Sequence, residues 1–432
     1  MKKSYLFSAF AAGMVMLSAC SSDGDLTGGN ESNDAVQEIV LQVANAGEGL
    51  QTRAGRPLYS SEAKQTIENV KVFICDAADD KIVKVESFDN WNTEEGSKPY
   101  GSAGKGHGRE KVIKYTGTEK LDNGTYKIYA YGFHTGSDYA ELDTKISNLA
   151  VGETLKENII LECNAVGEEI FAGSTKQFTI DNNNKGFYQT VVLNRQVSGT
   201  FGYFENIPYI DGATKLQLVA SNPNKSLVLG DFNSFDLLNN GTGNDGHVNY
   251  VVNGTNASTS KVIYTIDLKK WFTAIKDDDK DGIIDAVGNW HNTAITSGAN
   301  FKEGSVFGGS FLIPFQKNEN QTFVLKLVND EGQSLREWAV KLPSGDGQLS
   351  NYTLSYWNST ATAPIFATSS ATDEADKYSV VRNHLYGIGE RALDEPETPG
   401  TDPDKPEPLN KKQELTLRVN DNWEVIHKME LE

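Results

Sequence analysis

One short run of acidic residues has the spacing of a calcium-binding loop. Residues 277–285 read DDDKDGIID, with aspartates at alternate positions, a glycine at the sixth position and another aspartate at the ninth. Ca²⁺ prefers carboxylate oxygens, and glycine permits the sharp turn that brings them together. Gly288 stands at the twelfth position, where a bidentate glutamate is usual, so a solvated acidic turn is the alternative. The expected ligands are the side chains of Asp277, Asp279, Asp281 and Asp285 and the backbone carbonyl of Ile283.

No other group of residues has the spacing of a catalytic or cofactor site. The six histidines stand apart in the sequence, without an HExxH motif, and the chain has neither a GxSxG motif nor a P-loop. Calcium is therefore the one cofactor that the sequence suggests, and no cofactor is required. We expect the protein not to be an enzyme.

A cysteine near the N-terminus follows the features of an export signal. Lys2 and Lys3 precede an apolar stretch at residues 5–17 that is too short to span a bilayer as a helix. The next residues, Leu17-Ser-Ala-Cys20, resemble the bacterial lipobox, whose cysteine thiol receives a diacylglycerol. A plain secretory signal with a chance cysteine is the alternative. We expect a precursor that is anchored at the outer membrane through lipidated Cys20 alone.

The remainder of the chain is predicted to be all-β. A length of 432 residues favours two domains. The formal net charge of −19 opposes contact with nucleic-acid phosphates. Helical periodicity is scarce, and the sum of the strands suggests two β-sandwiches joined near residues 163–168. The predicted strands cover residues 36–45, 69–75, 81–88, 125–133 and 157–163, and then 187–193, 214–219, 248–252, 261–268 and 322–328.

The two ends of the chain resemble each other. After a proline-rich acidic segment, residues 413–432 read as one long amphipathic strand without a hairpin partner nearby. The start of this strand, residues 414–421, parallels residues 38–45, in which Ile39, Leu41 and Val43 share one face. A tail that folds back on its own chain is the alternative. The apolar face of the tail consists of Leu415, Leu417, Val419, Trp423, Val425, Met429 and Leu431.

A loop that suits proteolysis follows the first strand. Residues 51–57 read QTRAGRP and contain two arginines. Pro57 follows Arg56 and offers no N–H to a protease, so cleavage is expected between Arg53 and Ala54. Such a cut removes the lipid together with the first strand. The groove left behind accepts a strand from another chain by β-augmentation.

These features together resemble the FimA/Mfa-like fimbrillins of Bacteroidales, which build the type V pilus. Further matches are residues 168–174 (EEIFAGS), 193–197 (LNRQV), 206–208 (NIP) and 379–386 (SVVRNHLY). The resemblance implies two tandem transthyretin-like β-sandwich domains with a C-terminal extension strand. It also implies lipoprotein export, cleavage by an arginine-specific surface protease and polymerisation by donor-strand exchange. The implied partners are other fimbrial subunits, namely further copies of the chain and the anchor and tip proteins.

The resulting organisation has six parts. They are a signal peptide at 1–20, a tether and replaced strand at 21–53, sandwiches at 54–165 and 166–390, a linker at 391–412 that does not pack, and a donor strand at 413–432. Two alternatives remain. The chain is a tip adhesin of the same pilus, or a surface glycan-binding lipoprotein that uses Trp271, Trp290 and Trp357. Cys75 and Cys163 either pair with each other or stay as buried free thiols.

Overall fold

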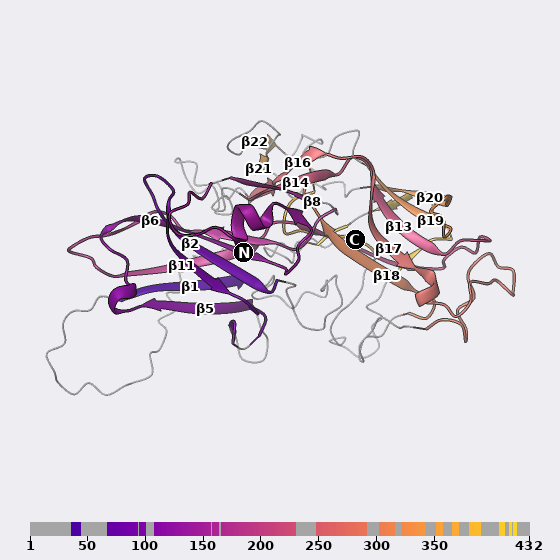
Figure 1. Cartoon of the computed structure of the whole chain (residues 1–432). Helices are drawn as coiled ribbons and strands as arrows, with labels where there is room; N and C mark the ends of the chain where they lie inside the picture. The colour runs from indigo at the N-terminus through magenta and orange to yellow at the C-terminus, as the bar shows by residue number, and fades with distance from the viewer. Residues whose placement is uncertain are drawn as a thin grey trace, which may run out of the picture.

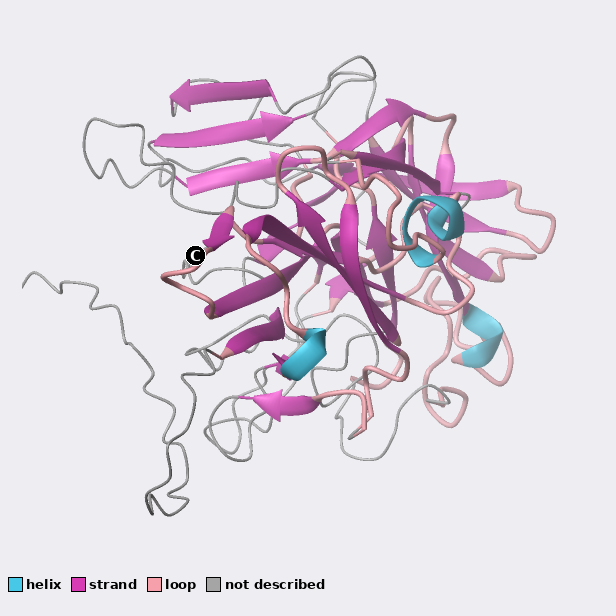
Figure 2. Ribbon diagram, turned by 60° about the vertical axis from the view of Figure 1, so that its left-hand side comes forward, coloured by secondary structure: helices cyan, strands magenta, loops and turns pink. Residues whose placement is uncertain are grey.

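The computed structural model consists of strands and loops with a few single helical turns, which confirms the predicted all-β class (Figure 2). The helical turns are η1 (Gly117–Glu119), η2 (Asp143–Ser147) and η4 (Leu268–Lys270). Within the part of the chain that is described, no helix is long and apolar enough to cross a membrane. The described residues are 36–44, 67–93, 95–100, 108–156, 158–163, 166–229, 248–291, 302–315, 322–341, 351–356, 365–370, 380–389, 406–410, 414–416 and 418–420.

A large sheet in the first half of the chain folds over on itself. In spatial order its strands are β3 (Ile82–Phe88), β2 (Asn69–Asp76), β6 (Gly124–Phe133), β9 (Phe171–Ser174), β11 (Phe187–Arg195), β1 (Gln37–Ala44), β5 (Gly108–Tyr115) and β4 (Lys98–Tyr100), with β10 (Phe178–Ile180) also paired to β6. Apolar residues of β1 and β11 pack against those of β2 and β6 in one core. The β1–β11 half therefore faces the β2–β6 half as the two layers of a sandwich (Figure 1).

The second face of β2 and β6 is covered as well. Phe73 and Cys75 of β2 and Tyr129 of β6 share a core with Leu161 and Leu227. The last two residues belong to a sheet of β16 (Gly254–Ala257), β14 (Asn224–Leu229), β8 (Ile159–Cys163) and β7 (Tyr139–Ala140). The β2–β6 layer is thus buried on both faces. This explains its nearly continuous apolar sequence, because a strand with one solvated face alternates apolar and polar residues.

A second sandwich follows in the chain. One layer contains β18 (Val306–Leu312), β12 (Ser198–Glu205), β23 (Leu385–Ile388) and β26 (Arg418–Asn420), with β24 (Glu407–Pro408) also on β12. The other contains β17 (Lys261–Asp267), β13 (Lys215–Ala220), β19 (Phe323–Val328), β20 (Ser334–Lys341) and β25 (Glu414–Thr416). Tyr203, Leu218 and Trp338 are among the fully buried residues between the layers. A separate small sheet holds β15 (Val248–Val252), β21 (Asn351–Tyr356) and β22 (Ile365–Ser370).

Two features of the predicted organisation differ in the structure. Strands on both sides of residues 165 and 166 share sheets, since β11 pairs with β1, β9 with β6, and β14 with β8. The predicted linker also packs in part. Leu409 is fully buried in the second core, and its amide donates to the Glu205 carbonyl at 3.0 Å. A leucine among prolines and acids still gains from burial when a core lies within reach.

Candidate functional site

The N-terminal strand β1 is an interior strand of its sheet. It runs parallel to β11, from the pair Gln37–Phe187 to the pair Val43–Leu193, and antiparallel to β5 on its other side. Ile39, Leu41 and Val43 are fully buried in the core between the layers. We call the seat of β1 between β5 and β11 the acceptor groove. Without β1, it would present two rows of unpaired backbone groups and an apolar floor.

A buried glutamine fixes the beginning of β1. Gln37 is 2% exposed, although it lies on the same face as the three aliphatic residues. Its side-chain amide donates to the carbonyls of Leu121 at 3.1 Å and Lys185 at 2.9 Å, and its carbonyl accepts from the Leu121 amide at 2.7 Å. A carboxamide is both donor and acceptor, which suits this set of backbone groups. The alternation of apolar residues in the sequence does not by itself single out Gln37.

The outward face of β1 carries charge-bearing contacts. Glu38 lies 3.0 Å from the ammonium of Lys114 on β5. Gln42 donates to a carboxylate oxygen of Glu110 on the same strand at 3.3 Å. Val40 also points outward, opposite Val112, but is only 6% exposed. The acceptor groove therefore contacts polar residues of the strand on its outer side as well as aliphatic residues on its floor.

The residues predicted for lipidation and for cleavage lie outside the described part of the chain. These are Cys20, Arg53 and Ala54. Of the predicted donor strand, Leu417, Trp423, Val425, Met429 and Leu431 also lie outside it.

The described part of the tail pairs with its own chain. In β25, Leu415 stands beside Val340 in a parallel pairing, and in β26 Val419 stands opposite Tyr386 in an antiparallel pairing. Each pairing extends over three residues. This is the fold-back alternative for these residues, and it places residues 414–416 and 418–420 along the second sandwich rather than in the acceptor groove.

The acidic loop brings three of its predicted ligands together. Carboxylate oxygens of Asp277, Asp279 and Asp285 lie within 4.8 Å of one another. The amides of Asp281 and Gly282 donate to the Asp277 carboxylate at 3.1 and 3.0 Å. The Asp281 amide lowers the pKa of Asp279, yet burial and the neighbouring carboxylates outweigh it and raise that pKa above its usual value. Such mutual repulsion is what a bound cation would relieve.

The backbone of this loop is left-handed at two positions, one of which is the glycine that the motif uses for its sharp turn. Lys280 and Gly282, at its fourth and sixth positions, have φ angles of 63° and 85°. The Asp281 carboxylate accepts from the amide of Ile283 at 2.8 Å. The Ile284 side chain is buried in the second core, and its amide donates to the Ile207 carbonyl. The core thus holds one side of the loop in place.

A buried polar cluster joins the two sandwiches. The sequence motifs contain its residues but did not indicate that they form one cluster. The Arg195 guanidinium contacts the Glu169 carboxylate at 2.7 Å and the Asn383 side chain at 3.0 Å. Gln196 accepts from the Arg382 guanidinium at 2.9 Å. These residues come from three of the short motifs on which the family resemblance is based. The motifs therefore mark one internal junction.

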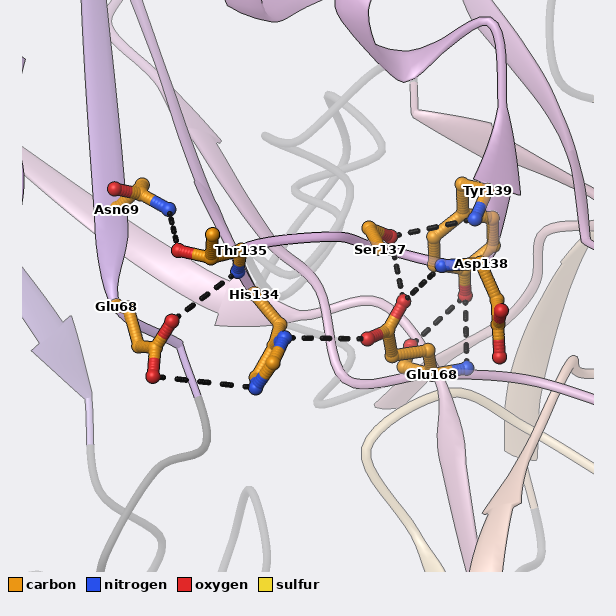
Figure 3. A network of polar contacts seen from close by, with 8 residues as sticks. All are labelled: Glu68, Asn69, His134, Thr135, Ser137, Asp138, Tyr139 and Glu168. Carbon is orange, nitrogen blue, oxygen red and sulfur yellow. Dashed lines mark hydrogen bonds and ion pairs between the residues drawn. The ribbon is translucent and has the colours of Figure 1, made fainter.

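An exposed polar network lies at the surface near this junction. Figure 3 shows His134 between the carboxylates of Glu68 and Glu168, with ring nitrogens 4.0 and 3.9 Å from the nearest oxygens. Thr135 donates to Glu68 and lowers the pKa of that carboxyl. Glu168 in turn accepts from Ser137 at 2.5 Å. The network ties the start of β2 and the loop after β6 to the segment before β9.

The two described tryptophans among those proposed for glycan binding serve in packing. Trp271 is 4% exposed and meets Phe307 edge-on, with ring centroids 5.3 Å apart. Trp290 is half-buried and donates its indole N–H to the Ser305 carbonyl at 2.7 Å. Trp357 lies outside the described residues. Cys75 and Cys163 are both buried and are thiols rather than a disulfide.

Comparison with known proteins gives distant structural similarity alone. No protein-family model and no curated protein matches the chain. A fimbrial assembly protein from Parabacteroides distasonis is 12% identical with a TM-score of 0.32, covering 81% of this chain and 98% of that one. The fimbrial anchor protein Mfa2 from Porphyromonas gingivalis is 10% identical with a TM-score of 0.34, covering 81% and 100%.

The tip fimbrial protein Mfa3 from Porphyromonas gingivalis, in a C-terminally truncated form, is 9% identical with a TM-score of 0.37, covering 89% of this chain and 98% of that one. Fimbrial proteins of Bacteroidales are thus among the solved structures to which this chain is similar, as the sequence resemblance predicts.

Proposed function

We propose that this chain is a structural subunit of a surface fimbria, exported as a lipoprotein and polymerised by exchange of β-strands. The observation that carries the proposal is the position of β1. This strand fills an interior place in its sheet and buries Ile39, Leu41 and Val43, yet the loop after it contains the expected cleavage site. Cleavage after Arg53 would turn a complete sheet into one with an open groove.

The extent of strand pairing favours transfer of the tail into such a groove on another subunit. Within the described residues, β25 and β26 each pair with one strand of their own chain over three residues. The acceptor groove offers a strand on either side, along seven residues of β11 and eight of β5. A seated strand also buries aliphatic side chains, at roughly 1.5–3 kcal/mol each before the cost of ordering. The longer, two-sided pairing favours transfer of the tail once β1 has left.

The first experiment is to determine the N-terminus of the protein in assembled surface fibres. We expect Ala54, because Pro57 protects the alternative site after Arg56. A fibre whose subunits still begin at lipidated Cys20 would rule out processing.

The second experiment removes the tail. A chain that ends at Asn410 keeps Leu409 in the second core and loses β25 and β26. We expect it to fold, to be exported and to be cleaved, but not to form fibres. Long fibres from cells that make only this shortened chain would disprove strand donation by the tail.

The tail also bears on the choice between a stalk and a tip subunit. A tip subunit has nothing beyond it to receive a donor strand, whereas this chain ends in a long amphipathic segment. We therefore propose the stalk role over the tip adhesin. The burial of Trp271 and the half-burial of Trp290 engage two of the three tryptophans of the glycan-binding alternative in packing, which favours the fimbrial role.

A further inference from the structure

The acceptor groove contains a small polar subsite at the point where β1 begins. Its groups are the amide and carbonyl of Leu121 and the carbonyl of Lys185, and Gln37 satisfies all three. Alternation alone would place an apolar residue here, because Gln37 shares its face with Ile39, Leu41 and Val43. The glutamine is therefore a specific fit to these backbone groups.

The same polar exception occurs in the tail. Residues 37–43 read QEIVLQV and residues 413–419 read QELTLRV, so that four of the seven positions are identical. In both segments a glutamine precedes three aliphatic residues at alternate positions of the sequence. We propose that residues 413–419 of a second copy of this chain occupy the acceptor groove in the register of β1, with Gln413 in the subsite of Gln37. The inference rests on the strand exchange proposed above.

The subsite would set this register by disfavouring the registers that are shifted along the groove. A strand keeps its inward face only when it slips by an even number of residues. A slip of two residues brings either Leu415 or Lys411 to the subsite. Leucine leaves the three backbone groups without partners, and lysine brings a charge that lacks an acceptor function. Gln413 is the residue of the tail that satisfies both the donor and the acceptors.

The outer face of the groove fits the same register. Glu414 takes the position of Glu38 and keeps the contact with Lys114. Arg418 takes the position of Gln42 beside Glu110, where a hydrogen bond of 3.3 Å from an uncharged amide to the carboxylate becomes an ion pair. Exposed ion pairs contribute little to affinity, but this pair distinguishes the incoming strand from the one it replaces.

Disulfide trapping between two copies tests the register. The acceptor chain lacks the signal peptide and Cys20, carries Val112→Cys, and has a specific protease site in place of residues 51–56 so that β1 can be released. The donor chain carries Thr416→Cys. Val112 lies opposite Val40 and is 43% exposed, so the substitution leaves the core intact. Acceptors with Glu110→Cys or Lys114→Cys report slips of two residues in either direction.

We expect cross-linked dimers of positions 112 and 416 after cleavage, in clear excess over dimers through positions 110 or 114, and none without cleavage. Gln413→Leu in the donor should reduce the yield at limiting concentration roughly tenfold, because buried polar groups lose their partners. Lys412→Leu is the matched control, since its counterpart is the exposed Val36, which directly precedes β1.

Each failure has a distinct meaning. Equal cross-linking by wild-type and Gln413→Leu donors, or an excess at positions 110 or 114, would overturn the assignment of Gln413 while leaving strand exchange intact. A disulfide formed within a single chain that carries both cysteines, with none between chains, would overturn the second copy as the partner. Absence of any cross-link from the wild-type tail would overturn the proposed function itself.

Discussion

Leu41 and Leu417 should affect the stability of different forms of the protein. Leu41 is fully buried at the middle of β1, beside Val191 of β11. Leucine-to-alanine substitutions at such sites cost about 2–5 kcal/mol, through lost transfer energy and the cavity that remains. Leu41→Ala should therefore lower the free energy of unfolding of the precursor by about 3 kcal/mol. Fibres should be unaffected, because the proposed assembly removes β1 from their subunits.

Leu417→Ala should give the reverse result. If the tail occupies the acceptor groove, Leu417 takes the place of Leu41 there, and its truncation should weaken fibres by a similar free energy. The two measurements are urea unfolding of the purified precursor and the urea concentration at which isolated fibres dissociate into subunits. Val112→Ala is a suitable control, since a 43% exposed side chain on the neighbouring strand should change stability by less than about 0.5 kcal/mol.

The reciprocal pattern is the essential result. A Leu41→Ala substitution that weakened mature fibres as strongly as the precursor would show that β1 stays in the polymer. A Leu417→Ala substitution that left fibres as stable as the wild type would show that the groove is filled by another segment.

Three further predictions concern the second sandwich and the junction. Burial lowers the pKa of His384 from 6.5 to about 4, so between these pH values the unfolded chain binds a proton that the folded chain does not bind. The free energy of unfolding should therefore fall by up to about 3 kcal/mol as the pH drops from 6.5 to 4. His384→Gln should reduce this loss in urea titrations at different pH values, and an unchanged pH profile would contradict the prediction. Millimolar Ca²⁺ should raise the melting temperature of the protein. The double variant Asp279→Ala, Asp281→Ala should abolish this rise, and the control Asp278→Ala should keep it. An unchanged melting temperature of the wild type would show that residues 277–285 form a solvated acidic turn. Glu169→Ala should destabilise the chain by roughly 3–5 kcal/mol because it leaves a buried arginine without its carboxylate, and a loss below 1 kcal/mol would show that the junction does not depend on this pair.

Local patterns were sufficient to locate many of the strands. The alternation in residues 36–45 predicted β1 and the face that Ile39, Leu41 and Val43 share, because period-two burial is a property of the strand itself. The acidic loop was also visible as a motif, since its ligands are close in sequence. Features that depend on neighbouring residues can be read in this way.

Long-range pairing could not be read from the same patterns. Nothing local in β14 or β8 indicates that they pair across the expected domain boundary, and the register of β1 beside β11 joins residues 150 apart. Gln37 was overlooked because its partners are backbone groups of distant loops. The packing of Leu409 was missed because the composition of its segment suggested a solvated linker.

The pairing of β1 with β11 has a consequence for the order of events during biogenesis. A chain is synthesised from its N-terminus, yet β1 cannot complete its parallel pairing until residues 187–193 have emerged. Its interior place in the sheet also requires β5 on the other side. The first strand to be made is thus among the later ones to be seated, and a nascent subunit passes through a stage with an unfilled groove. In the proposed assembly, cleavage at residue 53 before that stage ends would remove the strand that protects the subunit from premature partners, so we expect the proposed protease to act outside the cell, on finished subunits.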